Sequence, residues 1–462
     1  MIISIVGSGG KTTLMKKMAA TFCAEGKRVF VTTTTHMFLE EKMLLTDNAQ
    51  TIIHALEEDG FVMAGISDGK KLCALSGETF DAVCPHADVV LVEADGSRMH
   101  PLKYPNNSEP VIPQNTDEII VVCGLNALGQ KASAVCHRLE LVKNCLEITD
   151  DTFITPHHVY QLVMEGYVKP LREKYPLKKI TVVPRHDGSL YQRAIAAMLM
   201  AERDPGFIRK DWFCPQPSLI ICGGGHVAKE VAAIAARLDF RIRIIDERPE
   251  IMNSDYFPAT AEVICDSYDN LTNYLEAGAC YIVVTPNHKA DYQCVSTILG
   301  TDFLYLGMIG SKRKVATVKE KLQEDGFTEE QISRVFAPIG LAINAVTPAE
   351  IAISILAQII QEKNKTHAAS ADKVLLESKE SGILCIITEK HGSTPRGVGS
   401  MMLVTGDHVI GSIGGGEPEY LAIQHARAVS CLDMKSYTMN NTIANGLDMV
   451  CGGRISVLFI PV

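Results

Sequence analysis

The chain has 462 residues, a formal net charge of −10 at neutral pH and 14 cysteines that form no C-x-x-C pair. Its length accommodates two or three domains, and its 47% hydrophobic and 21% charged residues are ordinary for globular proteins. An acidic balance without a long Lys/Arg cluster argues against nucleic-acid binding, and no apolar stretch approaches the roughly 18 residues of a membrane helix. We therefore expect a cytoplasmic protein with reduced thiols and no membrane contact.

Strand-like and helix-like runs alternate through the first 205 residues. Strand candidates lie at residues 1–6, 27–32, 87–92 and 119–123, an alternation that is typical of a parallel α/β sheet. Because the first run leads directly into a glycine-rich loop, we predict a P-loop NTPase-like domain over residues 1–205.

The first loop has the residues of a phosphate cradle: Gly7, Gly9, Gly10, Lys11, Thr12 and Thr13. In a P-loop, backbone N–H groups face the phosphates, a lysine reaches the β- and γ-oxygens, and a hydroxyl binds Mg²⁺. We assign the charge to Lys11 and the metal contact to Thr12, although Ile5 stands where the usual first glycine would be. The alternative is a glycine-rich turn without a ligand.

Carboxylates follow the strand candidate at residues 87–92. Glu93 and Asp95 stand at its carboxyl end, where a Mg²⁺ ligand or a water-orienting group belongs in a parallel sheet. We predict Glu93 as a metal ligand beside Thr12, and Lys11, Glu93 and Asp95 as catalytic residues for nucleotide hydrolysis. The alternative for the two acids is a solvated loop.

These motifs resemble the YqeC family, P-loop proteins associated with selenium-dependent molybdenum hydroxylases. The matching pieces are Gly9-Gly10-Lys11-Thr12-Thr13, residues 32–36, Glu93-Ala94-Asp95-Gly96 and Pro101-Leu102-Lys103. Related NTPases often read guanine with Asn-Lys-x-Asp, of which residues 181–187 retain only Asp187. The resemblance implies Mg²⁺ with a nucleotide, and ATP versus GTP stays open.

A connector at residues 206–217 leads to a second α/β block at residues 218–362. Its first strand candidate ends in Gly223, Gly224, Gly225 and His226, which together with Ala228 fit G-x-G-x-x-A. Asp246, about 20 residues further on, stands where a ribose-binding acid would lie. These residues alone leave two interpretations, a dinucleotide-binding fold and a doubly wound sheet whose loop binds another ligand.

The second block as a whole resembles the Rossmann-like domain of the XdhC/CoxI family, the xanthine dehydrogenase accessory factors. The resemblance rests on residues 223–226, 246–249, 307–314 and 338–341. It implies that the molybdenum cofactor is bound as cargo by the Gly223–His226 loop, by Asp246 and Arg248, and by a basic segment with Ser311, Lys312 and Arg313. On charge alone, that segment would more commonly be a solvated helix start. Asn287 and Ala342 depart from the family pattern.

A second linker, at residues 363–376, precedes a β-rich tail at residues 377–462. Residues 392–399, 411–419 and 449–453 resemble the N-terminal domain of the same accessory factors, here placed after the Rossmann-like part. One of two family cysteines is replaced at Glu417, and Cys451 remains. Cys451, flanked by glycines, is the candidate reactive thiol, with a structural cysteine as the alternative.

The sequence thus predicts three domains: a P-loop NTPase-like parallel sheet, a doubly wound Rossmann-like domain and a small α+β domain. Together the resemblances imply a maturation factor for a molybdenum hydroxylase. Its expected partners are the apo-hydroxylase client and a sulfur or selenium donor protein, and a homo-oligomer stays open. The main alternative is an NAD(P)-dependent oxidoreductase with a fused P-loop ATPase, and a pure interaction scaffold is the other.

Overall fold

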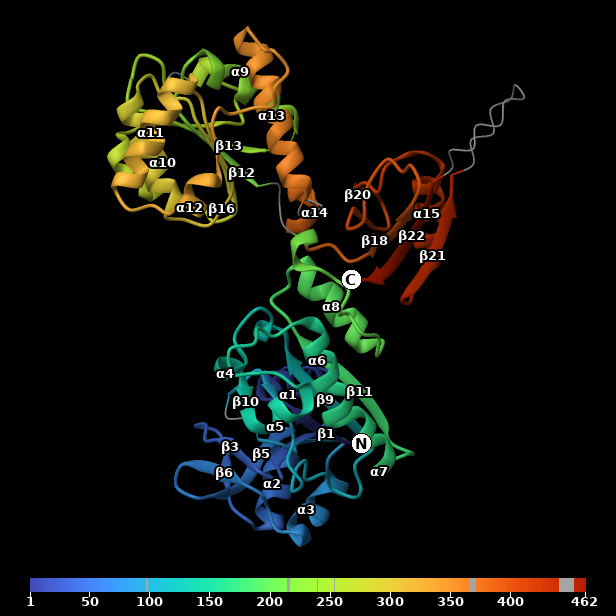
Figure 1. The fold of residues 1–462 in the computed structure, drawn as a ribbon. Coiled ribbons are helices and arrows are strands. Elements are labelled where there is room, and N and C mark those ends of the chain that lie inside the picture. The colour runs from blue at the N-terminus through green and yellow to red at the C-terminus, as the bar shows by residue number, and fades with distance from the viewer. Residues whose placement is uncertain (97–98, 214–216, 239, 253, 366–370, 440–452) are drawn as a thin grey trace, which may run out of the picture. The chain divides into compact units, whose positions relative to one another are not determined.

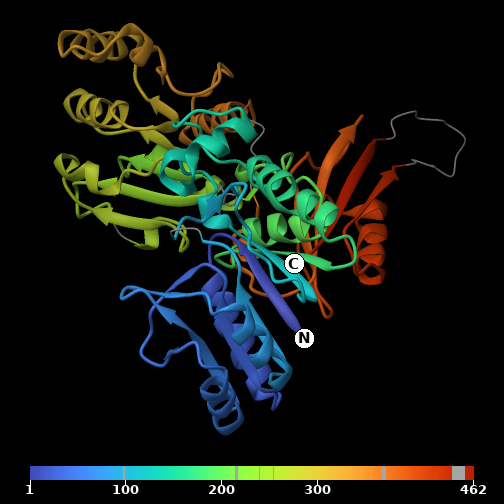
Figure 2. The same cartoon turned by 90° about the horizontal axis from the view of Figure 1, so that it is seen from below.

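The computed structural model describes residues 1–96, 99–213, 217–238, 240–252, 254–365, 371–439 and 453–462 (Figures 1 and 2). The described chain is mixed α/β and forms two compact units. Unit 1 contains residues 1–209, 377–394 and 402–462, and unit 2 contains residues 210–376 and 395–401. Among the described helices, none combines the length and apolarity needed to cross a bilayer.

A largely parallel sheet organises the N-terminal part of unit 1. Its described strands run in the order β11-β9-β1-β7-β2-β5-β6-β3, with β4 paired to β5. All residues of β1 are buried, as expected for an interior strand that is covered on both faces. The strands β11, β9, β1, β7 and β2 are mutually parallel, so their carboxyl ends share one edge of the sheet.

The elements of this part have the following bounds. The strands are β1 (Ile2–Gly7), β2 (Val29–Thr33), β3 (His36–Phe38), β4 (Leu44–Leu45), β5 (Phe61–Ser67), β6 (Lys71–Cys73), β7 (Val89–Glu93), β9 (Glu118–Gly124) and β11 (Lys179–Arg185), with β8 (Leu102–Lys103) and β10 (Cys136–His137) paired separately. The helices are α1 (Lys11–Ala24), α2 (Ala49–Asp59), α3 (Gly77–Val83), α4 (Ala132–Val135), α5 (Leu139–Leu146), α6 (Pro156–Val163), α7 (Lys169–Lys174) and α8 (Leu190–Met200).

Unit 2 contains a parallel sheet in the order β14-β13-β12-β15-β16-β17. Alternate residues of β12 face different apolar clusters: Ile220 packs with residues of α10 and α11, whereas Leu219 and Ile221 pack with residues of α9 and α13. The sheet is therefore doubly wound, as predicted. The chain continues from β12 to β13 on one side and later to β15 on the other, which makes the carboxyl end of β12 a topological switch point.

The elements of unit 2 have the following bounds. They are β12 (Ser218–Cys222), α9 (His226–Ala235), β13 (Arg241–Asp246), β14 (Glu262–Cys265), β15 (Ala279–Val283), α10 (His288–Leu299), β16 (Phe303–Met308), α11 (Lys312–Glu324), α12 (Glu329–Ser333), β17 (Val335–Phe336) and α13 (Pro348–Lys365), and α14 (Lys373–Glu377) follows. Part of the predicted linker at 363–376 is thus helical, since its Lys and Asn residues extend α13 beyond the apolar stripe.

An antiparallel sheet forms the β-rich tail, in the order β20-β19-β18-β22-β21. Its strands are β18 (Ile383–His391), β19 (Met401–Val404), β20 (Val409–Gly411), β21 (Asp433–Thr438) and β22 (Arg454–Pro461), and its helix is α15 (Gly416–Ala428). The helix packs against the sheet (orange to red in Figures 1 and 2), where the rings of His425 and Phe459 meet edge to face with centroids 4.7 Å apart. The mixed α/β class with a β-rich tail is confirmed, while the division into three domains stays a prediction.

Candidate functional site

The first glycine-rich loop joins β1 to α1. Gly7, Gly9 and Gly10 have φ angles of 92°, 78° and 120°, a region that side chains disfavour. A Cβ atom on Gly7 would lie only 2.1 Å from the carbonyl oxygen of Val122. Gly10 is the N-cap of α1 and has no side chain to cap it. The first N–H groups of α1 therefore face the loop without a capping side chain, an arrangement that attracts a phosphate.

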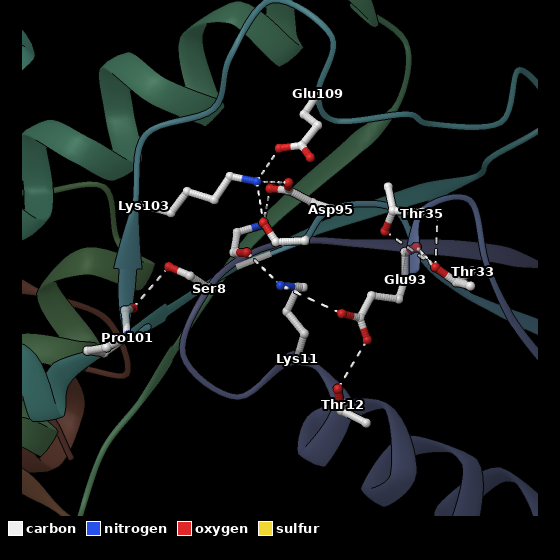
Figure 3. Close-up of polar contacts among 12 residues, drawn as sticks. Ser8, Lys11, Thr12, Thr33, Thr35, Glu93, Asp95, Pro101, Lys103 and Glu109 are labelled. Carbon is white, nitrogen blue, oxygen red and sulfur yellow. Dashed lines mark hydrogen bonds and ion pairs between the residues drawn. The ribbon is translucent and has the colours of Figure 1, made fainter. Parts of the chain in front are cut away.

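Lys11 is buried within this loop, with 3% of its surface exposed. Its Nζ donates to the carbonyl oxygen of Gly7 at 2.8 Å and lies 3.8 Å from Oε1 of Glu93 (Figure 3). Burial lowers the pKa of Lys11, and the nearby carboxylates of Glu93 and Asp95 only partly offset that effect. The loop therefore encloses a cation whose charge depends on neighbouring anions.

Glu93 ends β7 and contacts both Lys11 and Thr12. Its Oε2 accepts a hydrogen bond from the Thr12 hydroxyl at 3.1 Å (Figure 3). Burial raises the pKa of Glu93, although Lys11 and Thr12 favour its ionised form. A hydroxyl and a carboxylate side by side are oxygen ligands of the kind that Mg²⁺ takes in phosphate-binding sites.

Asp95 belongs to a different polar network. Its Oδ2 accepts hydrogen bonds from the backbone N–H of Gly7 at 3.1 Å and from the Tyr167 hydroxyl at 2.7 Å. Its Oδ1 forms a buried ion pair with Lys103, which also pairs with Glu109 (Figure 3). Burial raises the pKa of Asp95 in spite of Lys103. Because both oxygens are engaged by protein donors, Asp95 fixes the start of the loop and does not contact Thr12.

Two further residues complete the Asp95 network. Arg138 lies with Nη1 2.8 Å from Oε2 of Glu109. Burial opposes ionisation of Glu109, but Lys103 and Arg138 together lower its pKa to about 2. Tyr167 comes from a π-helical turn, η3 (Met164–Val168), between α6 and α7, a feature that is frequent at functional sites.

Arg185, the last residue of β11, lies beside the phosphate loop. A Cβ atom on Gly10 would be 3.1 Å from Cγ and 3.5 Å from Nε of Arg185. Within the part of the chain that the structure describes, its guanidinium has no hydrogen-bond or ion-pair partner. An arginine placed in this way is suited to bind a phosphate oxygen that enters the loop.

The threonines after β2 mainly hold the backbone around Glu93. The hydroxyl of Thr33 donates to the carbonyl oxygen of Glu93 at 2.8 Å and accepts from the N–H of Thr35 at 3.0 Å. Thr32 donates to the carbonyl oxygen of Ala64 at 2.8 Å. Thr13, by contrast, is exposed on α1. The predicted hydroxyls therefore lie at this edge, but Thr32 and Thr33 act in support of Glu93.

The second loop, between β12 and α9, is also shaped by close backbone contacts. Gly223 has a φ of 111°, and a Cβ atom there would lie 2.5 Å from the carbonyl oxygen of Val284. The N–H of Gly224 donates to Oδ2 of Asp246 at 2.7 Å. Arg248 donates to the same carboxylate through Nε at 2.9 Å and Nη2 at 2.7 Å. The structure thus brings Gly224, Asp246 and Arg248 together as predicted, but it pairs them with one another.

Space and an unmatched hydroxyl remain beside the second loop. Gly225 is the N-cap of α9, and a Cβ atom on it would have no other atom within 4 Å. Tyr268 is buried, and its hydroxyl has no hydrogen-bond partner among the described residues. Burial, followed by the charges of Asp246 and neighbouring thiols, raises the pKa of Tyr268. The loop can therefore accept a phosphate-bearing ligand without a steric conflict at Gly225.

The basic segment is a helix start and not a loop. Ser311 caps α11 by accepting the N–H of Lys314 at 3.3 Å, and Lys312 and Arg313 are exposed in the first turn. Lys314 pairs with the buried carboxylate of Asp291. The serine side chain competes with any anion for this helix terminus, because it already satisfies one N–H group. Only the charges of Lys312 and Arg313 remain available there.

In the tail, a protein carboxylate occupies the glycine-rich turn before α15. Oε2 of Glu419 accepts the N–H groups of Ile413, Gly414 and Gly415 at 2.8, 3.1 and 3.0 Å. Glu417, which replaces the family cysteine, is exposed. Cys451 lies outside the described residues, so its predicted role stays a prediction.

Comparison with known proteins identifies the segments. Models of the YqeC protein family, of the XdhC Rossmann domain, and of the XdhC and CoxI family match residues 3–140, 219–359 and 375–435. The chain is a fusion of YqeC-type and XdhC-type segments. The Rossmann match precedes the XdhC and CoxI match, which confirms the order predicted from the motifs.

Three curated relatives are similar to parts of this fusion. The uncharacterized protein YqeB of Escherichia coli K12 is 32% identical over 196 residues, which cover 42% of this chain and 36% of the relative. The uncharacterized protein YqeC of the same organism is 36% identical over 169 residues, covering 35% and 64%. A probable xanthine dehydrogenase subunit from Bacillus subtilis is 26% identical over 153 residues, covering 33% and 44%. The chain therefore spans between 36% and 64% of the length of these relatives.

The YqeC-type segment gathers Gly7, Lys11, Thr12 and Glu93 at one sheet edge, as the motifs predict. Four charged or polar residues near them do not stand out in the sequence as site residues: Glu109, Arg138, Tyr167 and Arg185. Arg185 has the clearest signal, since it directly follows an apolar run. Glu109, Arg138 and Tyr167 stand in irregular or helical stretches without a motif, so only the fold brings them to Asp95 and Lys103.

Proposed function

We propose that the YqeC-type segment binds a nucleoside triphosphate with Mg²⁺ and hydrolyses it. The observation that carries this proposal is the buried Lys11 inside a positive-φ glycine loop, next to the Thr12–Glu93 pair. In this proposal Lys11 and Arg185 bind phosphate oxygens, and Thr12 and Glu93 hold the metal. Mg²⁺ supplies charge neutralisation at the β- and γ-phosphates when it is bound.

The residues fit this role by exchange of partners. Lys11 now donates to Gly7 and lies near Glu93, contacts that a phosphate would replace. Glu93 now accepts from Thr12, and both oxygens can turn to a cation. Charge is conserved in each exchange, so the desolvated groups stay compensated. ATP and GTP are both compatible with these residues.

Binding of MgATP and MgGTP to the full chain tests this proposal. Lys11→Ala should weaken binding of either nucleotide and reduce phosphate release by two to four orders of magnitude, roughly the range for removing a charge-stabilising group. Lys17→Ala, on an exposed position of the same helix, should leave both unchanged. Equal binding by the wild type and Lys11→Ala would refute the proposal.

We further propose that the whole chain is an accessory factor of a molybdenum hydroxylase. Support comes from the xanthine dehydrogenase accessory family matched by the XdhC-type segments, and from the name of the Bacillus subtilis relative. The cargo would be the molybdenum cofactor, held by the Gly223–His226 loop, Arg248, Lys312 and Arg313. The open N-cap at Gly225 and the unmatched Tyr268 hydroxyl suit a ligand that carries a phosphate and polar ring atoms.

The finer steps rest on the family resemblance. In this proposal the factor presents the cofactor for sulfur or selenium loading, with Cys451 as the carrier thiol, and then delivers it to the apo-hydroxylase. Loss of the γ-phosphate would time one of these steps by releasing loops that it holds. A sulfur or selenium donor protein is the second expected partner.

Nicotinamide dinucleotide is the competing ligand for the second loop. An acid that binds a ribose must offer its carboxylate to two hydroxyls, whereas Asp246 already accepts hydrogen bonds from Gly224 and Arg248. This favours a cofactor other than NAD. A thermal-shift panel with NAD and isolated molybdopterin separates the two, because the ligand that binds raises the unfolding temperature.

A further inference from the structure

A group of metal-binding side chains lies on the outer strands of the N-terminal sheet, apart from the phosphate loop residues. β5 and β6 form an antiparallel hairpin, and β3 pairs with the other side of β6. His36 of β3 stands directly opposite Cys73 of β6 in this register. Cross-strand partners have Cβ atoms about 4.5–5.5 Å apart and project from the same face of the sheet.

The alternation of the two strands turns His36 and Cys73 away from the core. The neighbouring pair, Met37 and Leu72, is buried, with 3% and 0% exposure, and packs in the apolar cluster under the sheet. His36 is exposed and Cys73 is half-buried. An imidazole and a thiol therefore share the outer face, where an ion can reach them.

Asp68, in the turn between β5 and β6, brings a carboxylate to the same place. Its Oδ1 accepts the N–H groups of Lys70 and Lys71 at 2.9 and 2.7 Å, which fixes the side chain. These bonds, with a smaller contribution from His36, lower the pKa of Asp68. One ligand atom each of His36, Asp68 and Cys73 lies within 4.8 Å of the other two.

We propose that His36, Asp68 and Cys73 form a binding site for a divalent cation of the zinc class, with water as a fourth ligand. Imidazole nitrogen and thiolate sulfur suit Zn²⁺, whereas Mg²⁺ and Ca²⁺ prefer sites made of oxygen alone. A thiolate and a carboxylate together balance the charge of the ion. Bond lengths of about 2.0–2.3 Å in a tetrahedron separate ligand atoms by about 3.3–3.8 Å, so small side-chain rotations would close the site.

The nearest lysine on the hairpin does not stand against an ion there. Nζ of Lys71 lies 5.6 Å from the centroid of the Phe38 ring, on the cross-strand pair beyond Met37 and Leu72. A bound ion would join β3 to the β5–β6 turn and so stabilise the edge of the sheet. Because β3 follows Thr33 and Thr35 closely, the same ion would also restrain the segment that supports Glu93.

Titration of the reduced full chain with Co²⁺ and Zn²⁺ alone tests the site. We expect one equivalent of Co²⁺ to give the absorption of a tetrahedral thiolate complex, which Zn²⁺ then displaces. Cys73→Ser should abolish the thiolate-to-cobalt band, and His36→Ala and Asp68→Asn should each weaken Zn²⁺ binding at least about tenfold, since even outer-shell changes cost 10–100-fold.

Matched controls exclude other thiols and histidines. Cys265 and His54 are exposed elsewhere, so Cys265→Ser and His54→Ala should retain the band and the affinity. Far-ultraviolet circular dichroism checks that each variant is folded, and the three site variants test the proposal independently of one another. A band that persists in Cys73→Ser, or is lost equally in Cys265→Ser, would overturn the proposal, as would the same Zn²⁺ affinity in the wild type and His36→Ala.

Discussion

At the scale of single residues, Lys11 and Glu93 place opposite charges together where water is largely excluded. Burial lowers the pKa of the lysine and raises that of the acid, so each residue stays charged mainly because of the other. Binding of a phosphate and a cation would give each charge a stronger partner. Arg185 differs, because no described residue offsets its charge.

Arg185→Ala should therefore weaken nucleotide binding with little effect on folding. A charged hydrogen bond contributes about 1.5–3 kcal/mol, so we expect the dissociation constant of MgATP or MgGTP to rise roughly 10–100-fold. Isothermal titration calorimetry measures this directly. Arg172→Ala, which removes an arginine paired with Glu202, is the matched control. An unchanged dissociation constant for Arg185→Ala would mean that the guanidinium does not reach the nucleotide.

Glu109 supplies a second residue-scale prediction, on stability. Its pKa of about 2 is below the unfolded value, which is about 4.3. Ionised Glu109 thus stabilises the fold above pH 4.3, and the contribution disappears as the pH falls toward 2. Glu109→Gln should lower the free energy of unfolding at pH 7 by about 1–3 kcal/mol, because Lys103 and Arg138 lose a charged partner.

Urea unfolding across this pH range checks the prediction for Glu109. The difference between the wild type and Glu109→Gln should shrink as the solution becomes more acidic. Glu165→Gln, which changes an exposed acid paired with Lys169, should have little effect at any pH. A difference that grows toward low pH would contradict the assigned network.

At the scale of elements, the sequence predicts what local patterns encode. Apolar runs locate the parallel strands, and the glycines before α1 and α9 locate both loops, because positive φ and close backbone contacts require glycine at Gly7 and Gly223. Contacts distant in sequence are not predictable in this way. Tyr167 is 72 positions from Asp95, and nothing in a π-helical turn marks its partner. The prediction of a loop at the start of α11 is wrong because the charges there obscure the serine cap.

The N-terminus of α9 provides an element-scale prediction. Gly225 has an ordinary backbone conformation and open space at its Cβ position, so Gly225→Asp should fold normally. The added carboxylate would repel a phosphate at the helix N-terminus, and bound molybdopterin should be lost. Gly225→Ala, which adds a methyl group without charge, is the control and should retain it. Pterin fluorescence after purification from the host measures occupancy, and equal occupancy in all three proteins would contradict the assignment.

At the scale of the whole molecule, the fusion joins two phosphate-binding loops in one chain, one in each compact unit. If one protein holds a nucleotide and a cofactor for a common purpose, the two sites should influence each other. Such coupling is a free energy, and thermodynamics requires it to be reciprocal. This requirement holds for any arrangement of the units.

We therefore predict that MgATP or MgGTP changes the affinity of the full chain for molybdopterin by some factor, and that molybdopterin changes the nucleotide affinity by the same factor. Typical couplings of 1–3 kcal/mol correspond to roughly 5–150-fold, which titrations with and without a saturating second ligand resolve. Lys11→Ala should remove the nucleotide effect on molybdopterin binding, and Lys17→Ala should preserve it. Two affinities that are each independent of the other ligand would instead describe two separate binding modules, and the nucleotide could then act on the cofactor only through a partner protein.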